Sequence, residues 1–199
     1  MNYFLTGGTG FIGRFLVEKL LARGGTVHVL VREQSQEKLD TLRERWGADE
    51  SRVKAVIGDL TSPNLGIDAK TMKSLKGNVD HFFHLAAVYD MGADEKSQQA
   101  TNIEGTHSAV NAAAAMEAGC FHHVSSIAAA GLFKGTFRED MFEEAEKLDH
   151  PYLLTKHESE KVVRESCTVP FRITALVWWL VTQRPVRWTR STGPITSSR

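Results

Sequence analysis

A glycine-rich segment near the start of the chain, TGGTGFIG at residues 6–13, most constrains the fold. Residues 2–5 before it, which are apolar except for Asn2, predict a short buried strand, and apolar residues at helical spacing after it predict a helix. A strand, a glycine turn and a helix N-terminus form an anion site, because backbone N–H groups and the positive end of the helix dipole point at a phosphate. The segment therefore predicts binding of a dinucleotide pyrophosphate, with a tight turn without a ligand as the alternative.

The composition is that of a soluble globular protein with one domain. The chain has 199 residues, 42% of them hydrophobic, and its 24 basic residues balance its 24 acidic ones. This balance gives no basis for a nucleic-acid or anionic-membrane partner. The most apolar late stretch, residues 175–181, is far too short to span a bilayer. Because the first expected strand begins at residue 2, we expect no signal peptide and a cytoplasmic location.

The two cysteines predict neither a disulfide nor a metal site. Cys120 and Cys167 stand far apart and fit no metal-ligand or redox spacing. We therefore expect two free thiols in a reducing compartment and no bound metal.

Strand and helix patterns alternate along the chain. The expected strands are residues 2–5, 26–31, 53–57, 79–85 and 121–125, and the expected helices are residues 35–46, 68–75, 97–118 and 152–166 in addition to the one after the glycine turn. Repeated strand–helix units predict an α/β fold, a doubly wound parallel sheet of Rossmann type with helices on both faces. Ligands of such sheets bind beyond the carboxyl ends of the strands, so the residues after each strand are the candidates for a site.

Arg32 follows the second expected strand. A protein specific for NAD usually carries an acidic residue there to bind the ribose hydroxyls, whereas a guanidinium suits a 2′-phosphate. The position therefore favours NADP over NAD as the cofactor, and an ordinary exposed surface arginine is the alternative.

The next two strands are followed by candidates for contacts with the rest of the dinucleotide. Asp59 could accept a hydrogen bond from the adenine amino group and Leu60 could cover the ring, although a helix N-cap also explains Asp59. Leu85, Ala86 and Ala87 follow the fourth strand, and small side chains there would let a ribose and nicotinamide lie against the backbone. Core formation alone explains two alanines about as well.

The last candidates are a Tyr-x-x-x-Lys pair and a serine pair. Tyr152 and Lys156 lie on one face of the expected helix, where the ammonium would favour the phenolate form and aid proton transfer. Ser125 and Ser126 end the fifth strand, and a hydroxyl there could hold a substrate oxygen. Each feature alone also arises by chance.

Taken together and in this order, the motifs resemble the extended branch of the short-chain dehydrogenase/reductases. The motifs are TGGTGFIG at 6–13, GDL at 58–60, HLAA at 84–87, NIEGT at 102–106, HVSSIAAAG at 123–131 and YLLTK at 152–156. Within the branch they look most similar to thioester and fatty-acyl reductases, also called male-sterility-type NAD-binding domains. The resemblance covers roughly residues 1–172 and implies a small-molecule substrate and, as helices of this fold often pair subunits, a homodimer.

The resemblance also implies roles for individual residues. Tyr152 would be the general acid/base, Lys156 would bind the nicotinamide ribose, Ser126 rather than Ser125 would orient the substrate, and Asn102 would support the site. The predicted cofactor-binding residues are Thr6, Gly7, Gly8, Thr9, Gly10, Phe11, Ile12, Gly13, Arg32, Asp59, Leu60, Leu85, Ala86, Ala87, Tyr152 and Lys156.

The last part of the chain departs from this pattern. We expect an NAD(P)-binding domain at residues 1–173 and an aberrant or unstructured tail at 174–199, with the substrate subdomain of the family incomplete. The tail holds three of the four tryptophans, no acidic residue and no amphipathic face that would favour a membrane or nucleic-acid role. Our hypothesis is a frameshift: suitable codons for residues 174–182, read one base earlier, spell the strand and Arg-Pro-Gly turn that the family expects. A clean frame on sequencing the gene would refute it.

The sequence is consistent with three functions. The first is an NADPH-dependent reductase of a carbonyl or acyl thioester. The second is a nucleotide-sugar epimerase or dehydratase, against which Arg32 argues because such enzymes often hold NAD. The third is a fragment that binds cofactor without catalysis, which the departure of residues 174–199 favours.

Overall fold

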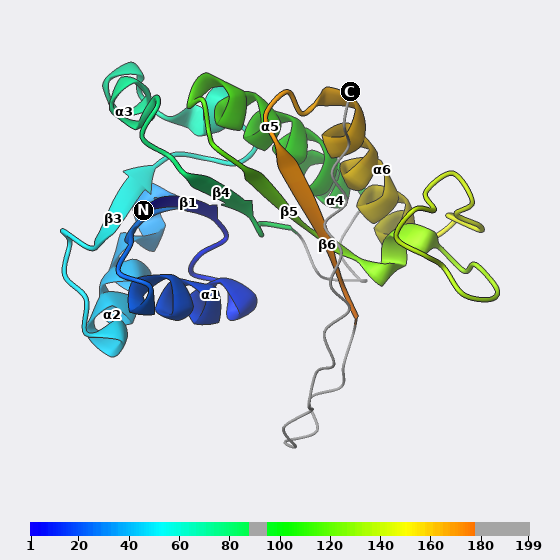
Figure 1. Cartoon of the computed structure of the whole chain (residues 1–199), viewed down its shortest axis with the longest axis horizontal. Coiled ribbons are helices and arrows are strands. Elements are labelled where there is room, and N and C mark those ends of the chain that lie inside the picture. The colour runs from blue at the N-terminus through cyan, green and yellow to red at the C-terminus, as the bar shows by residue number, and fades with distance from the viewer. Residues whose placement is uncertain (88–94, 178–199) are drawn as a thin grey trace.

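The computed structural model describes residues 1–87 and 95–177, and its centre is a six-stranded parallel sheet (Figure 1). The strands are β1 (Asn2–Thr6), β2 (Thr26–Val31), β3 (Val53–Ile57), β4 (His81–His84), β5 (Phe121–Ser126) and β6 (Phe171–Leu176). Their order is β3-β2-β1-β4-β5-β6, with every neighbouring pair parallel. This order confirms the doubly wound Rossmann-type sheet and puts the point where the order reverses between β1 and β4.

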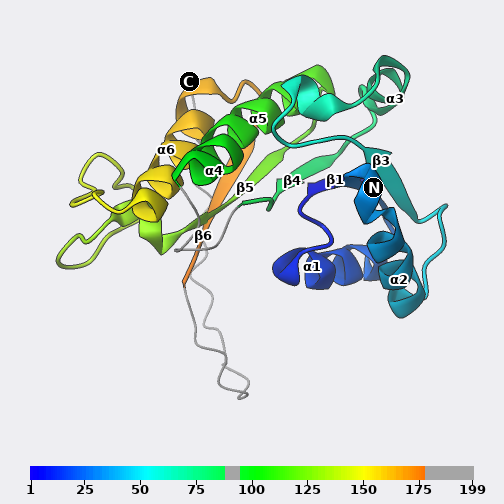
Figure 2. The same cartoon turned by 180° about the vertical axis from the view of Figure 1, so that it is seen from behind.

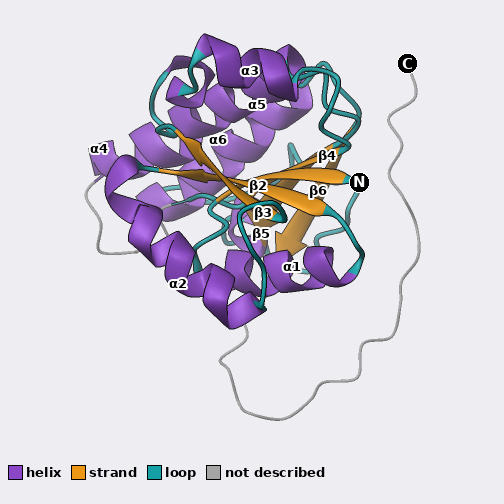
Figure 3. Cartoon of the chain, turned by 90° about the vertical axis from the view of Figure 1, so that its left-hand side faces the viewer, coloured by secondary structure: helices purple, strands orange, loops and turns teal. Residues whose placement is uncertain are grey.

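Helices cover both faces of the sheet. On one face lie α1 (Phe11–Ala22) and α2 (Gln36–Trp46), and on the other lie α3 (Ala69–Leu75), α5 (Gly105–Ala115) and α6 (Pro151–Ser166) (Figures 1 and 2). Viewed from the side, the sheet is seen edge-on between these two layers (Figure 3). Short helical segments complete the described fold: η1 (Glu33–Ser35), η2 (Pro63–Gly66), α4 (Glu95–Gln98), η3 (Gln99–Glu104) and η4 (Ile127–Ala130). Among the described helices, none has the length and apolar composition needed to cross a membrane.

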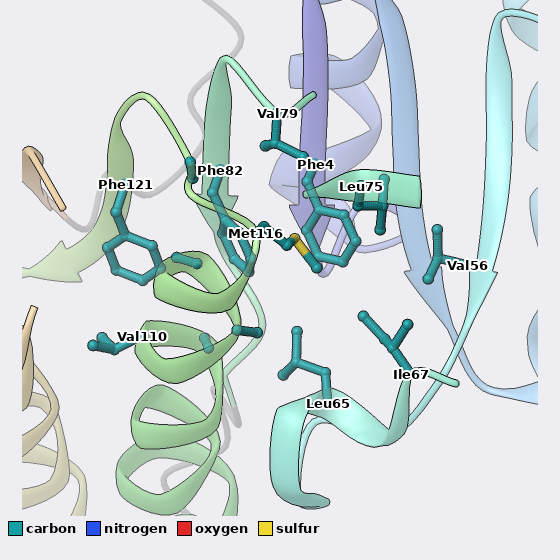
Figure 4. Packing of buried hydrophobic residues seen from close by; sticks show 14 of the residues in the cluster. Phe4, Val56, Leu65, Ile67, Leu75, Val79, Phe82, Val110, Met116 and Phe121 are labelled. Carbon is teal, nitrogen blue, oxygen red and sulfur yellow. The ribbon is translucent and has the colours of Figure 1, made fainter. Parts of the chain in front are cut away.

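The core has two parts, one on each face of the sheet. Under α5 and α6, Phe4, Phe82 and Phe121 stand side by side on neighbouring strands and belong to one buried cluster with Met116 (Figure 4). Under α1 and α2, the core is built from alternate residues of β1 and β2 with Val17 and neighbouring aliphatic side chains. Both faces of the central strands are thus buried, as a parallel sheet requires.

The structure corrects the expected helix at residues 97–118. Three segments replace it, because a π-helical turn, η3, interrupts the α-helix between α4 and α5. The helix also ends earlier than expected, at Ala115, where Glu117 adopts a positive φ of 52° and turns the chain toward β5. No proline marks either feature, and the positive φ falls on Glu117 rather than on a glycine.

The sheet extends past residue 173, where we expected the tail to begin. Thr174, Ala175 and Leu176 belong to β6 and pair with Val124, Ser125 and Ser126 of β5. The expected boundary therefore falls inside a strand. Residues 178–199 lie outside the described part of the chain, so the expectation for the rest of the tail stays a prediction.

Candidate cofactor and catalytic site

The glycine turn brings β1, α1 and the end of β4 too close together for side chains. Gly7 has a φ of +72°, and a Cβ atom on it would lie 2.7 Å from the backbone nitrogen of Ala86. A Cβ atom on Gly13 would collide with the carbonyl oxygen of Gly7. Gly10 is the N-cap of α1 and provides no side-chain acceptor for the first N–H groups of the helix. The turn therefore has the compact form and open helix N-terminus that a pyrophosphate site needs.

Hydrogen bonds tie the carboxyl ends of β1 and β4 together beside this turn. The Leu85 N–H donates to the Thr6 carbonyl at 3.2 Å, and the Ala86 N–H donates to the Thr6 hydroxyl at 3.3 Å. Thr6 is fully buried, whereas Ala87 is exposed. The segment 85–87 thus approaches the glycine turn through its backbone, where the sequence predicts the nicotinamide ribose.

The remaining predicted residues of the glycine segment line its outer side. Phe11 and Ile12 are 65% and 47% exposed at the start of α1. The guanidinium carbon of Arg14 lies 5.0 Å from the ring centres of both Phe11 and Phe15. These rings form an exposed apolar edge beside the helix N-terminus. Thr9 and Gly8, a half-buried and a buried residue, complete the turn.

Arg32 is exposed and lies directly beyond β2, the strand next to β1. Its charge reaches Asp59, which follows β3: hydrogen bonds from Thr61, with a smaller effect of Arg32, hold the pKa of Asp59 below its usual range. Arg32 therefore stands at the sheet edge that carries the glycine turn, with its side chain accessible to a phosphate.

Asp59 and Leu60, which the sequence predicts as adenine contacts, both make contacts within the protein. The Asp59 carboxylate accepts hydrogen bonds from the Thr61 N–H at 2.8 Å and the Thr61 hydroxyl at 2.6 Å. Asp59 closes a turn in this way, and the N-cap of the following η2 is Ser62, so the N-cap alternative is wrong. Leu60 packs against Gly105, where a Cβ atom would lie 2.8 Å from its Cγ.

Tyr152 and Lys156 are both buried on α6, at 7% and 5% exposure. The helix begins at Pro151, with the His150 imidazole accepting the Tyr152 N–H at 3.1 Å. The Lys156 ammonium donates to the Val124 carbonyl of β5 at 3.3 Å. Burial lowers the pKa of Lys156 to about 8, although the carboxylate of Glu160 opposes the shift. The lysine is therefore a buried cation held against the sheet.

The two serines at the end of β5 point to opposite faces of the sheet. Ser125 is buried and donates to a carboxylate oxygen of Glu160 at 2.7 Å, and the other oxygen of Glu160 accepts from Arg164 at 2.7 Å. Ser126 accepts the Ala128 N–H at 3.2 Å, which leaves its hydroxyl proton available for another acceptor. Ser125 thus holds a buried carboxylate, and Ser126 is the candidate for contact with a substrate.

Asn102 lies in the π-helical turn η3 and is 2% exposed. Its amide donates to the Thr155 hydroxyl at 3.2 Å, and Thr155 in turn donates to the Tyr152 carbonyl at 3.2 Å. The extra residue of the π turn thus brings Asn102 against the part of α6 that lies between Tyr152 and Lys156.

Several polar residues of the site were missed by the sequence-based predictions. His84 and His123 are fully buried under α5 and α6, and Glu160 is 6% exposed. The spacing of Lys156 and Glu160 places them one helical turn apart, a signal that was available. The histidines stand in short strands that contain other histidines, where no local pattern marks these two as buried polar partners.

Three further residues meet at the amino ends of β4 and β5, on the opposite edge from the site. Potential ligand atoms of His81, Cys120 and His122 all lie within 4.8 Å of one another, a grouping that the sequence spacing did not show. The two imidazoles bond each other at 3.0 Å. Burial, His81 and the nearby Arg172 lower the pKa of His122 to about 4. The positive charge of Arg172 would also repel a metal ion bound there. We therefore interpret His81 and His122 as a hydrogen-bonded pair rather than as metal ligands.

Comparisons with known proteins agree with this fold. The family model described as male sterility protein, an NAD-binding family, matches residues 5–185. A linear gramicidin synthase protein of Brevibacillus parabrevis is 32% identical over 173 residues, 80% of this chain and 3% of that protein. A Drosophila melanogaster protein named as a fatty acyl-CoA reductase is 33% identical over 126 residues, 55% of this chain and 24% of that protein.

Solved structures of other proteins show the same fold. The terminal R domain of the myxalamid PKS-NRPS pathway has a TM-score of 0.75 at 28% identity, over 88% of this chain and 48% of that one. UDP-glucuronic acid 4-epimerase of Bacillus cereus, solved with NAD, has a TM-score of 0.68 at 24% identity, over 89% and 56%, a likeness of fold. The chain thus spans about half the length of these solved proteins and a quarter or less of the two relatives.

Proposed function

Because the chain belongs to the NAD-binding male sterility protein family of extended short-chain dehydrogenase/reductases, we propose that it binds NADP and serves a reductase of acyl thioesters or carbonyl compounds. The family is one of nicotinamide-dependent, reductase-like or epimerase-like domains. The observation that carries the proposal is the buried Tyr152–Lys156 pair on α6, held against β5 beyond the same sheet edge as the glycine turn.

The residues present fit a dinucleotide. The glycine turn would hold the pyrophosphate at the open N-terminus of α1, and the backbone of 85–87 would lie along the nicotinamide ribose. Arg32, exposed at the end of β2, would pair with a 2′-phosphate. A bound nicotinamide cofactor would supply the hydride for the reduction.

The protein's own groups would handle the proton. Tyr152 would give its phenolic proton to the substrate oxygen while the carbonyl carbon receives hydride, so that a ketone or aldehyde becomes an alcohol. A thioester would yield an aldehyde after the thiol leaves. Lys156, still charged at pH 7 with a pKa of about 8, would bind the ribose and favour the phenolate that forms. Ser126 would hold the substrate oxygen beside Tyr152.

Cofactor titration of the purified chain tests this proposal. We expect NADPH to bind more tightly than NADH. A turnover assay with a long-chain acyl thioester, in which NADPH consumption is monitored, then tests for reduction. Equal affinity for both cofactors would contradict the role of Arg32. Failure of both to bind would refute the proposal as a whole.

Cofactor binding without turnover is a second candidate function for this chain. About half of the solved R-domain chain has no counterpart in residues 1–199, and substrates in an enclosed site need walls that exclude water. Tight NADPH binding with no reduction of any thioester would favour this function. An epimerase or dehydratase activity is a third outcome, which a screen of nucleotide sugars with NAD would detect.

A further inference from the structure

Buried hydrogen bonds run without interruption from the glycine turn to the catalytic helix. They begin at the Thr6 hydroxyl, which lies 2.7 Å from Nδ1 of His84. Nε2 of His84 lies 3.1 Å from the Thr106 hydroxyl, which donates to the Asn102 carbonyl at 2.6 Å. The Asn102 amide then reaches Thr155, which bonds the Tyr152 carbonyl. The side chains involved are 0–2% exposed.

The direction of these bonds fixes the tautomer of His84. The Thr106 hydroxyl has a single proton, which it gives to the Asn102 carbonyl, so it can only accept from Nε2 of His84. A neutral imidazole carries one N–H, and Nδ1 must therefore accept the proton of the Thr6 hydroxyl. That hydroxyl accepts in turn from the Ala86 N–H. All donors and acceptors at His84 are matched only when Nε2 carries the hydrogen.

The surroundings of His84 keep its ring neutral. Burial, with a smaller effect of the Lys156 cation, lowers the pKa of His84 to about 3. The His123 ring stacks on it at a centroid distance of 5.6 Å, and burial, with smaller effects of His84 and Lys156, holds the pKa of His123 well below its ordinary value. The ring therefore keeps this single tautomer across the whole pH range in which the protein would work.

We infer that His84, held as the Nε2–H tautomer between Thr6 and Thr106, is a positioning residue that couples the glycine turn to the helix carrying Tyr152 and Lys156. This coupling rests on the proposed function, because it matters where a cofactor occupies one end and proton transfer takes place at the other. Cofactor binding at the turn would restrict the motion of Thr6 and Ala86. The hydrogen bonds through His84 would then restrict the motion of η3 and α6 as well.

Nitrogen NMR of the chain labelled with ¹⁵N-histidine tests the tautomer without any cofactor. We expect the His84 signals of a neutral ring with Nε2 protonated and Nδ1 bare, unchanged down to about pH 4. A protonated Nδ1, or titration near pH 6.5, would overturn the inference. This result does not depend on whether NADPH binds, so it separates the inference from the proposed function.

Two substitutions divide the roles of the two ring nitrogens. His84→Gln can keep a donor toward Thr106 and loses the acceptor for Thr6, so NADPH affinity should fall about fivefold, the effect of one neutral hydrogen bond. His84→Asn can keep the acceptor for Thr6 and loses the donor to Thr106. It should retain NADPH affinity within about twofold. In the unmodified chain we expect NADPH to slow amide hydrogen exchange in residues 152–156, and in His84→Asn we expect no such slowing.

Ser159→Ala is the matched control for these variants. Ser159 is as buried as the members of the hydrogen-bond chain, but among the residues that the structure describes its hydroxyl bonds only the Lys156 carbonyl of its own helix. It should leave both NADPH affinity and the exchange response unchanged. If His84→Asn responds to NADPH as the control does, the coupling is refuted. If neither His84 variant folds, the NMR measurement on the unmodified chain decides.

Discussion

The buried charge of Lys156 is expected to lower the free energy of unfolding of the protein at pH 7. The pKa of this buried side chain falls from its ordinary 10.5 to about 8, which corresponds to about 3.4 kcal/mol against the charged form in the folded state. The hydrogen bond to the Val124 carbonyl, worth about 1 kcal/mol, is lost when the lysine is replaced. Lys156→Met, which keeps an unbranched apolar side chain, should therefore raise the free energy of unfolding at pH 7 by about 2 kcal/mol.

The pH dependence gives this prediction its sign. In the unfolded chain the lysine stays protonated up to about pH 10.5, whereas in the folded protein it loses its proton near pH 8. Between these values the unfolded state binds more protons, so stability rises with pH. From pH 7 to pH 9.5 the unmodified protein should gain about 2 kcal/mol from this group. The advantage of Lys156→Met should therefore disappear by pH 9.5.

Urea unfolding at pH 7 and pH 9.5, followed by circular dichroism, measures both quantities. Lys161→Met is the matched control, because Lys161 lies on the same helix but is partly exposed. It should change stability by less than about 0.5 kcal/mol at either pH. A Lys156→Met protein less stable than the unmodified one at pH 7 would refute the reasoning. So would a difference between the two that does not change with pH.

The other predictions concern binding, stability and rate. Arg32→Glu should weaken NADPH by about 10-fold or more and NADH little, in parallel titrations; equal losses would contradict a phosphate contact. Gly10→Val should abolish binding of both cofactors while circular dichroism shows a retained fold. Ser125→Ala should cost about 1–3 kcal/mol in urea unfolding by leaving a buried carboxylate short of a donor, and Ser126→Ala less than about 1 kcal/mol. In a longer protein that turns over, Tyr152→Phe should keep NADPH binding and slow the reaction about 10²–10⁴-fold.

The sequence was sufficient for the first five strands of the sheet and for the glycine turn because their signals are local. A run of apolar residues, a glycine triplet and a helical period each lie within about fifteen residues. The pairing of Tyr152 with Lys156 was equally accessible, since four residues separate them on one helix. Strand alternation could also have shown that Ser125 and Ser126 face opposite sides of the sheet.

The parts that could not be predicted depend on distant contacts or on weak backbone preferences. Thr6 and His84 are 78 residues apart, and only the register of β1 against β4 makes them partners. The π-helical turn around Asn102 has no glycine or proline to announce it, and its benefit lies in a contact with Thr155, 53 residues away. Arg32 remains a prediction as the reader of the 2′-phosphate, because no local feature distinguishes it from a surface arginine.

On one face of the sheet, the buried side chains change from aromatic to polar within two residues along each strand. Phe4, Phe82 and Phe121 form a row across three neighbouring strands, and two residues further on, the next row is Thr6, His84 and His123. The ring nitrogens of His123 have no hydrogen-bond partner among the described residues, a cost that an aliphatic side chain would avoid. Such a polar row weakens the core, yet it lies at the carboxyl ends of the strands, beside Lys156 and next to the glycine turn. This row lowers stability at the end of the sheet where the site lies. Such a placement is expected when buried polar residues serve the site rather than the stability of the fold.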